Sequence, residues 1–303
     1  MIYFLMTIIL LCIILFAFYK FIDYLCNLVV HPNHKPLDES FKKEVTANSL
    51  DDFYNSFDMK NFRINSTLGY ELNCSFKRNY DSNKCMVICH GITANSGCSI
   101  KYAKLFYDKG FSVFIYDHRN HGLSGGNFSS MGYYEKFDLK TCVDWVYETL
   151  GTDIKLGVLG ESMGAGTVLQ YCAIDDRVDF CVEDCGYSSV NDLLALRLKD
   201  TLKHDIPGIL YLSNKLMQFK YKWCYEDASP IKYIKDLSLP ILFIHGACDT
   251  YVPTNMVYEL YEAKINGIKD LYVSEDSIHA ASLITNPEKY SSVVSSFLEK
   301  INL

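Results

Sequence analysis

The sequence lacks several patterns that would assign it to common functional classes. None of its 12 cysteines forms a C-x-x-C pair, so no zinc site built on paired thiolates is expected. Basic residues form no stripe, and the formal net charge of −7 argues against nucleic acid as a partner. No internal repeat or low-complexity tract is visible. The 303 residues, 49% of them hydrophobic, suit one large domain or two small ones with an ample core.

The chain begins with a long apolar run. Residues Ile2 to Phe18 are uncharged, and Lys20 ends the run, which is about long enough to cross a bilayer as a helix. A secretory signal peptide is the alternative, but it needs a basic segment before the run and small residues before a cleavage site. The chain has neither. The sequence therefore predicts an uncleaved single-pass anchor over residues 1–20, with membrane lipid as its partner.

The charges and cysteines around this anchor favour a cytoplasmic catalytic body. Lysines follow the span and none precedes it, and by the positive-inside rule this places the body in the cytoplasm. The cysteines show no small-domain disulfide spacing, and several lie inside apolar runs, as buried free thiols do in a reducing compartment. Residues 21–61 are interpreted as a polar tether with one short helix around Ser49 to Phe57. On this interpretation the anchor serves only to deliver the body to the membrane.

From Phe62 onward, candidate strands alternate with candidate helices. Two period-2 runs around Leu68-Gly69 predict an antiparallel hairpin. The unbroken apolar run at residues 85–89 is typical of a strand buried on both faces, and residues 111–116 are predicted to form the next buried strand. This alternation predicts an α/β domain over residues 62–303, with a mostly parallel twisted sheet flanked by helices.

A candidate nucleophile lies at Gly160-Glu161-Ser162-Met163-Gly164. An apolar strand precedes this pentapeptide and a candidate helix follows it, which is the pattern of a nucleophile elbow. Glycines suit so sharp a turn, and the helix N-terminus behind the serine favours negative charge. The motif should occur by chance about once in ten chains of this length. The motif therefore indicates a nucleophile only if a base and an acid follow Ser162 in the expected order.

His279 is the candidate base and Asp249 the candidate acid. His279 follows the last predicted strand and Asp249 the strand before it, so both belong to the sheet edge where carboxyl ends of parallel strands gather. Asp184 also ends a strand and is the competing acid. A histidine base would activate the Ser162 hydroxyl, and the acid would orient the imidazole.

Four motifs together resemble the α/β-hydrolase superfamily, close to its serine aminopeptidase and monoacylglycerol-lipase-like branch. They are His90-Gly91, residues 117–124 (DHRNHGLS), Gly160 to Gly164, and residues 245–253 (HGACDTYVP). The chain is also similar to membrane-anchored bacterial hydrolases of this fold. The resemblance covers Phe62 to the C-terminus and implies the order Ser162, Asp249, His279 for a working triad.

The positions of residues in the chain also predict an oxyanion hole and a cap over the substrate. Backbone N–H groups of Ile92, after His90-Gly91, and of Met163, after the nucleophile, are the expected oxyanion donors. Between residues 188 and 234 the alternation pauses, and leucines spaced at three and four predict two or three amphipathic helices. In this place they would form a cap whose apolar underside favours an acyl group.

The sequence thus predicts a membrane-tethered serine hydrolase of carboxylic esters that needs no metal or organic cofactor. An amide or peptide hydrolase with the same triad is one alternative. A catalytically silent hydrolase fold that binds or senses a ligand at the membrane is another, and a reactive Ser162 would discriminate against it.

Overall fold

The computed structural model describes residues 1–33, 50–56, 59–204 and 208–303. Its centre is an eight-stranded sheet with strand order β1-β2-β4-β3-β5-β6-β7-β8. β1 pairs with β2 and β2 with β4 in antiparallel fashion, whereas all other neighbours are parallel. The predicted mostly parallel sheet is therefore confirmed. The strands are β1 (Met59–Asn65), β2 (Glu71–Lys77), β3 (Lys84–Cys89), β4 (Ser112–Tyr116), β5 (Lys155–Glu161), β6 (Phe180–Asp184), β7 (Ile241–Gly246) and β8 (Lys269–Ser274).

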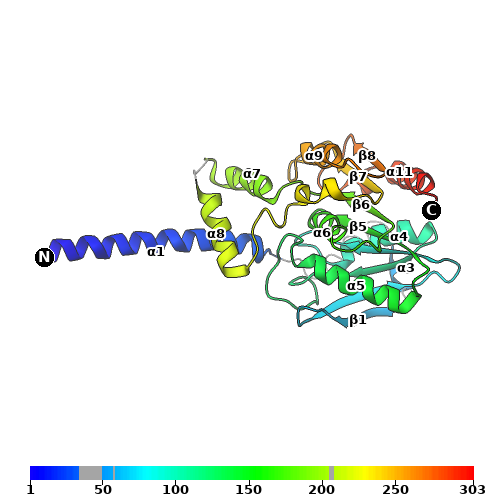
Figure 1. The fold of residues 1–303 in the computed structure, drawn as a ribbon, viewed down its shortest axis with the longest axis horizontal. Helices are drawn as coiled ribbons and strands as arrows, with labels where there is room; N and C mark the ends of the chain where they lie inside the picture. Colours follow the sequence, from blue (N-terminus) through cyan, green and yellow to red (C-terminus); the bar gives the residue numbers. More distant parts are fainter. Residues whose placement is uncertain (34–49, 57–58, 205–207) are drawn as a thin grey trace.

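Helices cover both faces of the sheet (Figure 1). One face packs against α5 (Glu135–Leu150), α6 (Met163–Tyr171) and α9 (Asn255–Ala263). The other packs against α4 (Ile100–Asp108), α10 (Ser282–Thr285) and α11 (Pro287–Lys300), with the short turn η1 (Ser96–Ser99) before α4. In β3, Cys85 and Val87 contribute to the first core and Met86 and Ile88 to the second. This alternation explains the unbroken apolar run, because both faces of the strand are buried.

The predicted hairpin is present at the edge of the sheet. Ile64 of β1 lies opposite Leu72 of β2, and Gly69 in the turn between them adopts φ +88°, a conformation that favours glycine. The short helix expected before it is α3 (Asp51–Asn55). The ends expected for that helix, Ser49 and Phe57, lie outside the described residues.

In the described part of the predicted insert there are two helices, α7 (Val190–Leu202) and α8 (Ile209–Tyr221). Two short turns, η2 (Pro230–Lys232) and η3 (Ile234–Asp236), lead from it back to β7. Beneath these helices is a third hydrophobic cluster, separate from the two sheet cores, that includes Met163, Leu193, Met217 and Trp223. The insert therefore lies beside the start of α6, where Ser162 is located.

The N-terminal helix extends further than the sequence predicts. α1 (Ile2–Val30) is one continuous helix whose first part projects away from the body, while its C-terminal part lies against α8 (Figure 1). Ile22, Cys26 and Val30 are buried there. The predicted boundary after residue 20 is therefore too early, since residues 21–30 belong to the packed body rather than to a tether. The physical reason is the spacing of these three residues at i, i+4 and i+8, which gives α1 one apolar face.

Candidate active site

Ser162 stands at a turn so tight that its flanking glycines are required. β5 ends at Glu161 and α6 begins at Met163, and Ser162 between them adopts φ 57° and ψ −114°. A Cβ atom on Gly160 would lie 2.1 Å from the carbonyl oxygen of Gly164, and one on Gly164 would lie 2.1 Å from that of Cys89. Both clashes involve backbone, which cannot move aside. The G-x-S-x-G pattern thus has a steric cause, and the left-handed backbone of Ser162 is held by the packing around it.

The structure brings Ser162, His279 and Asp249 together. The Nε2 atom of His279 lies 2.9 Å from the Ser162 Oγ atom, and its Nδ1 atom lies 2.7 Å from Oδ2 of Asp249. The other carboxylate oxygen of Asp249 accepts backbone N–H groups from Tyr251 and Val252, each at 2.9 Å. Asp249 is therefore held by its own loop while it contacts the imidazole. This is the geometry in which an acid orients a base that faces a hydroxyl.

The surroundings of Asp249 keep its carboxyl group ionised. Burial alone would raise the pKa of Asp249, but hydrogen bonds from His245 and His279 outweigh burial and hold the pKa well below its usual range. His245 Nε2 lies 3.3 Å from Asp249 Oδ2 and 2.9 Å from the carbonyl oxygen of Val252. An ionised acceptor thus faces the imidazole of His279 at neutral pH.

The competing acid, Asp184, is engaged elsewhere. Its carboxylate accepts hydrogen bonds from the hydroxyl groups of Tyr102, at 2.9 Å, and Tyr290, at 2.8 Å. Burial, and then the nearby charge of Glu161, raise the pKa of Asp184 to about 6. Its backbone carbonyl accepts the Ser162 N–H at 2.8 Å. Asp184 therefore stabilises the turn at Ser162 through its backbone, whereas Asp249 contacts the side chain of His279.

The two expected oxyanion donors border the same cavity as Ser162. Ile92 and Met163 both line it. Met163 is the first residue of α6, where backbone N–H groups have no partner within the helix. A Cβ atom on Gly91 would lie 3.2 Å from the Ser162 Cβ atom, so the loop after β3 passes close to the nucleophile. Ile92 and Met163 therefore border the same space as the Ser162 hydroxyl.

The other histidines of the motifs stabilise loops. His90 Nε2 accepts the backbone N–H of His118 at 2.9 Å, and His121 Nδ1 donates to the carbonyl oxygen of Arg119 at 2.8 Å. The first bond ties the loop after β4 to the loop after β3, and the second lies within the loop after β4.

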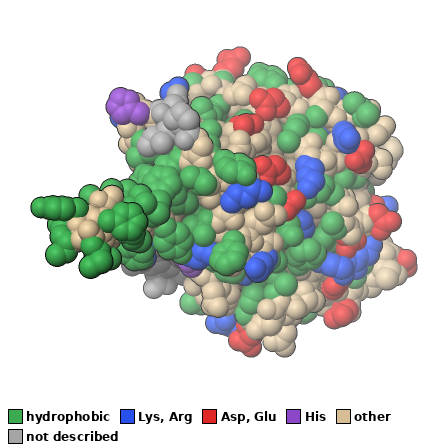
Figure 2. All heavy atoms as spheres, turned by 60° about the vertical axis from the view of Figure 1, so that its left-hand side comes forward, with side chains coloured by type: hydrophobic (Ala, Val, Ile, Leu, Met, Phe, Trp, Pro, Cys, Tyr) green, Lys and Arg blue, Asp and Glu red, His purple; other side chains and the backbone are tan. Residues whose placement is uncertain are grey.

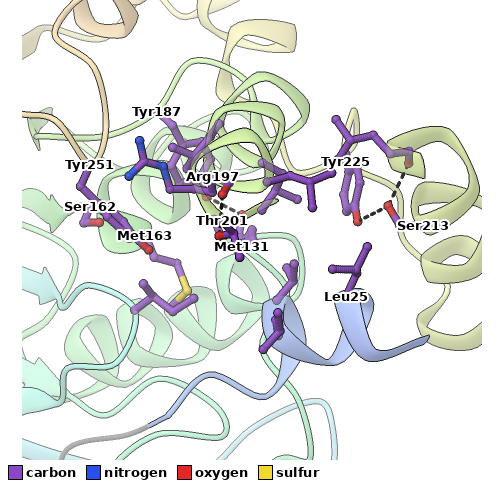
Figure 3. Close-up of a pocket in the computed structure, with 17 residues that line it drawn as sticks. Leu25, Met131, Ser162, Met163, Tyr187, Arg197, Thr201, Ser213, Tyr225 and Tyr251 are labelled. Atoms are coloured by element: carbon purple, nitrogen blue, oxygen red, sulfur yellow. Dashed lines mark hydrogen bonds between the residues drawn. The ribbon is translucent and has the colours of Figure 1, made fainter. Parts of the chain in front are cut away.

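A cavity of about 200 Å³ adjoins Ser162 and is lined mostly by apolar side chains (Figure 3). The cap helix α7 contributes leucines, as predicted, but two contributions were not predicted. Leu25, Leu28 and Val29 of α1 line the cavity, and so does Arg197 of α7. Arg197 donates to the carbonyl oxygen of Thr250 at 2.9 Å. The apolar spacing past residue 20 could have predicted that α1 contributes to the cavity. The lone arginine among the leucines of α7 could have predicted the contribution of Arg197.

Comparisons with known proteins agree with this architecture. The family described as "Serine aminopeptidase, S33" matches residues 80–182. The uncharacterized protein YqkD of Bacillus subtilis (strain 168) is 35% identical over 272 residues, which cover 88% of this chain and 89% of YqkD. Among solved structures, the esterase Pf2001 of Pyrococcus furiosus is similar with a TM-score of 0.67 and 26% identity, over 81% of this chain and 93% of that one.

A more distant structure has the same fold. Est1E of Butyrivibrio proteoclasticus, solved with ferulic acid bound, has a TM-score of 0.60 and 17% identity, over 80% of this chain and 100% of Est1E. The sheet order, the turn at Ser162 and these similarities lead to one assignment. The chain belongs to the α/β-hydrolase superfamily.

Proposed function

We propose that this protein is a membrane-tethered serine hydrolase that cleaves carboxylic esters through an acyl-Ser162 intermediate. The observation that carries the proposal is the pair of contacts made by His279, 2.9 Å to the Ser162 Oγ atom and 2.7 Å to Asp249 Oδ2. Ester cleavage is also the activity named for the structural relative Pf2001. The proposed arrangement is an anchor in the first part of α1, a linking segment, and a catalytic domain from residue 62 onward with the cap between residues 188 and 234.

The proposed mechanism has two balanced steps. His279 takes the hydroxyl proton of Ser162 as the Oγ atom attacks the ester carbonyl carbon, and the backbone N–H groups of Ile92 and Met163 stabilise the oxyanion. The carbon–oxygen bond to the alcohol breaks, and His279 passes its proton to the departing alcohol. Water then attacks the acyl-enzyme with His279 again as base, which releases the carboxylic acid and restores Ser162. Asp249 stabilises the imidazolium in both steps.

The lining of the cavity favours an ester over the free N-terminus of a peptide. An aminopeptidase must hold an ammonium group, for which a carboxylate is the natural partner. Among the described residues that line the cavity none is acidic, and Arg197 is the one charged side chain. Its guanidinium would repel an ammonium group. The peptidase alternative therefore has the family description in its favour but not the chemistry of the cavity.

The membrane part of the proposal rests on α1. This helix includes an 18-residue window of mean hydropathy 2.7 with none of that window buried against the body. All twelve cysteines carry free thiols, and eight of them are buried, which suits a reducing compartment. We therefore place the catalytic domain on the cytoplasmic face of the membrane.

Covalent labelling tests the proposed chemistry directly. A fluorophosphonate probe should label the full-length protein at Ser162, and Ser162→Ala should abolish labelling while the circular dichroism spectrum stays the same. Ser295→Ala on α11, away from the cavity, is the matched control and should label normally. Persistent labelling of Ser162→Ala would contradict the assignment. A wild-type protein that resists the probe would favour a catalytically silent, ligand-binding role.

A further inference from the structure

The cavity beside Ser162 extends toward the membrane helix. Ser162 and Met163 lie at one end, and Leu25 of α1 lies at the other, near Ser213 and Tyr225 (Figure 3). The Tyr225 hydroxyl donates to the Ser213 Oγ atom at 3.1 Å, so these polar groups satisfy each other at the far end. The space between is bordered by leucines of α7 and by α1. A chain attached to a carbonyl at Ser162 would therefore run toward α1.

The C-terminal part of α1 is fixed as a wall of this cavity by three polar contacts, one with the loop before α5 and two with α8. The carbonyl oxygen of Val30 accepts the backbone N–H of Ser129 at 2.8 Å. The Tyr221 hydroxyl of α8 donates to Asn27 Oδ1 at 3.1 Å. Lys220 of α8 pairs with Asp23. These bonds hold Leu25, Leu28 and Val29 in place, so this wall is built into the folded protein.

The residues of α1 that line the cavity lie a short distance along the helix from its proposed membrane-spanning part. α1 is continuous, and at 1.5 Å per residue Leu25 and Leu28 lie about 10–15 Å along the axis from Phe18, which is near the end of the uncharged run. That distance is comparable to a headgroup layer plus one or two helical turns. Around this point, exposed apolar side chains on α1 and α8 continue the hydrophobic surface of α1 onto the body (Figure 2). They are Tyr24, Leu28, Tyr211, Leu212 and Phe219.

We propose that residues 25–29 of α1 form the distal wall of an acyl-chain site, and that the substrate is a long-chain acyl ester drawn from the bilayer beside α1. This inference rests on the proposed function and specifies its substrate class. Each methylene group buried in the cavity should raise kcat/KM about fourfold until the chain reaches α1. The membrane helix then has two roles, because it anchors the protein and sets the length of the acyl chain.

Substitutions on α1 test the wall in the full-length protein in phosphatidylcholine vesicles. Leu25→Trp and Leu28→Trp fill the far end of the cavity, and the second site is 51% exposed, so the larger ring is compatible with folding. We expect each to lower the ratio of kcat/KM for p-nitrophenyl palmitate over p-nitrophenyl butyrate at least tenfold. Tyr24→Trp is the matched control, because Tyr24 is exposed on the same helical turn and does not line the cavity. An unchanged ratio in both leucine variants would overturn the α1 wall.

A second readout separates this inference from the proposed function. Fluorophosphonates with an ethyl or a hexadecyl chain should both label wild-type Ser162, the hexadecyl probe at least tenfold faster, and Leu25→Trp should remove that advantage. Labelling at equal rates by both probes would overturn the acyl site while the serine hydrolase stands. Failure of both probes to label the wild type would overturn the hydrolase itself.

The source of the substrate is tested by where the ester is placed. A palmitoyl ester in the same vesicles as the protein should be hydrolysed at least tenfold faster than the same ester in separate vesicles mixed with them. Equal rates in the two arrangements would show that the substrate arrives through water, and would overturn entry from the bilayer.

Discussion

Lys220 of the cap helix α8 forms an ion pair with Asp23 of the N-terminal helix α1, although 197 residues separate them in the sequence. The pair is only partly exposed, with 29% of the Lys220 side chain and 13% of the Asp23 side chain accessible. Beside it, the apolar faces of α1 and α8 are in contact. The contact joins the apolar N-terminal helix α1 to the insert helix α8 beside the candidate active site.

Reversing one charge of this pair should loosen the contact between the helices. Lys220→Glu places two carboxylates side by side, and we expect a loss of about 1 kcal/mol in unfolding free energy, or about 2 °C in Tm. The double exchange Asp23→Lys with Lys220→Glu should recover most of this loss. Lys215→Glu, on an exposed position of α8, is the control. Thermal unfolding of the detergent-solubilised protein provides the measurement, and equal Tm values for the single and double variants would argue against the pair.

The acid should be Asp249 and not Asp184. Asp249→Asn keeps the shape of the side chain but favours the wrong tautomer of His279, and turnover should fall about 10⁴-fold. Asp184→Asn should change turnover by less than about tenfold, because the amide oxygen can still accept from Tyr102 and Tyr290. Steady-state hydrolysis of p-nitrophenyl butyrate by both variants decides between them. The reverse ranking would transfer the acid to the end of β6.

Glu183 should make the fold less stable in alkaline solution. Burial raises the pKa of Glu183 from 4.5 to about 8, so between these values the folded protein keeps a proton that the unfolded chain releases. Its contribution to stability is therefore complete below pH 4.5 and declines as the pH rises to 8. Glu183→Gln mimics the protonated group and can still accept the Gly186 N–H.

We therefore expect Glu183→Gln to unfold with about 2–4 kcal/mol more free energy than wild type at pH 8.5, and with little difference at pH 5. Urea unfolding at the two pH values measures this. Glu148→Gln on the exposed side of α5 is the control and should follow the wild type at both. The same stability difference at pH 5 and pH 8.5 would show that protonation of Glu183 is not its cause.

Two truncations should behave differently because α1 has two parts. A chain that begins at Tyr19 keeps Ile22, Cys26 and Val30 in the packed cluster, and it should be soluble and folded. A chain that begins at Pro36 loses all three, at about 1.5–3 kcal/mol for each of Ile22 and Val30, and should unfold or aggregate. Size-exclusion chromatography and thermal unfolding compare the two. Equal stability would restore the simpler view, suggested by the sequence, that the anchor only delivers the body.

The full-length chain should sediment with membranes and resist carbonate extraction, because the exposed apolar part of α1 is unsuited to water. Protease added to intact spheroplasts should leave the catalytic domain uncut if it faces the cytoplasm. Digestion from outside would reverse the proposed orientation. Release of a shorter soluble form would show that α1 is cleaved as a signal peptide.

The sequence alone was sufficient for features governed by local rules. The G-x-S-x-G turn is visible in the chain because close backbone approaches at Gly160 and Gly164 exclude any Cβ atom. The buried strand β3 could be predicted because both of its faces are covered, so its residues form a continuous apolar run instead of alternating with polar residues. The first part of α1 could also be predicted from the sequence, because a long uncharged apolar run is typical of a helix that spans a membrane. Each of these constraints acts between residues that are neighbours in the chain or on one element.

Tertiary structure decided the features that depend on distant partners. Asp184 and Asp249 both follow strands, and the sequence could only rank them; the folded chain supplies Tyr102 and Tyr290 to the first and His279 to the second. The end of α1 looked like a polar tether because Asp23 and Asn27 interrupt it. Their partners, Lys220 and Tyr221, lie nearly 200 residues later. Such residues can hold a cavity wall in place only when the cap folds onto them, since a polar group loses its cost of burial only once its partner is in place.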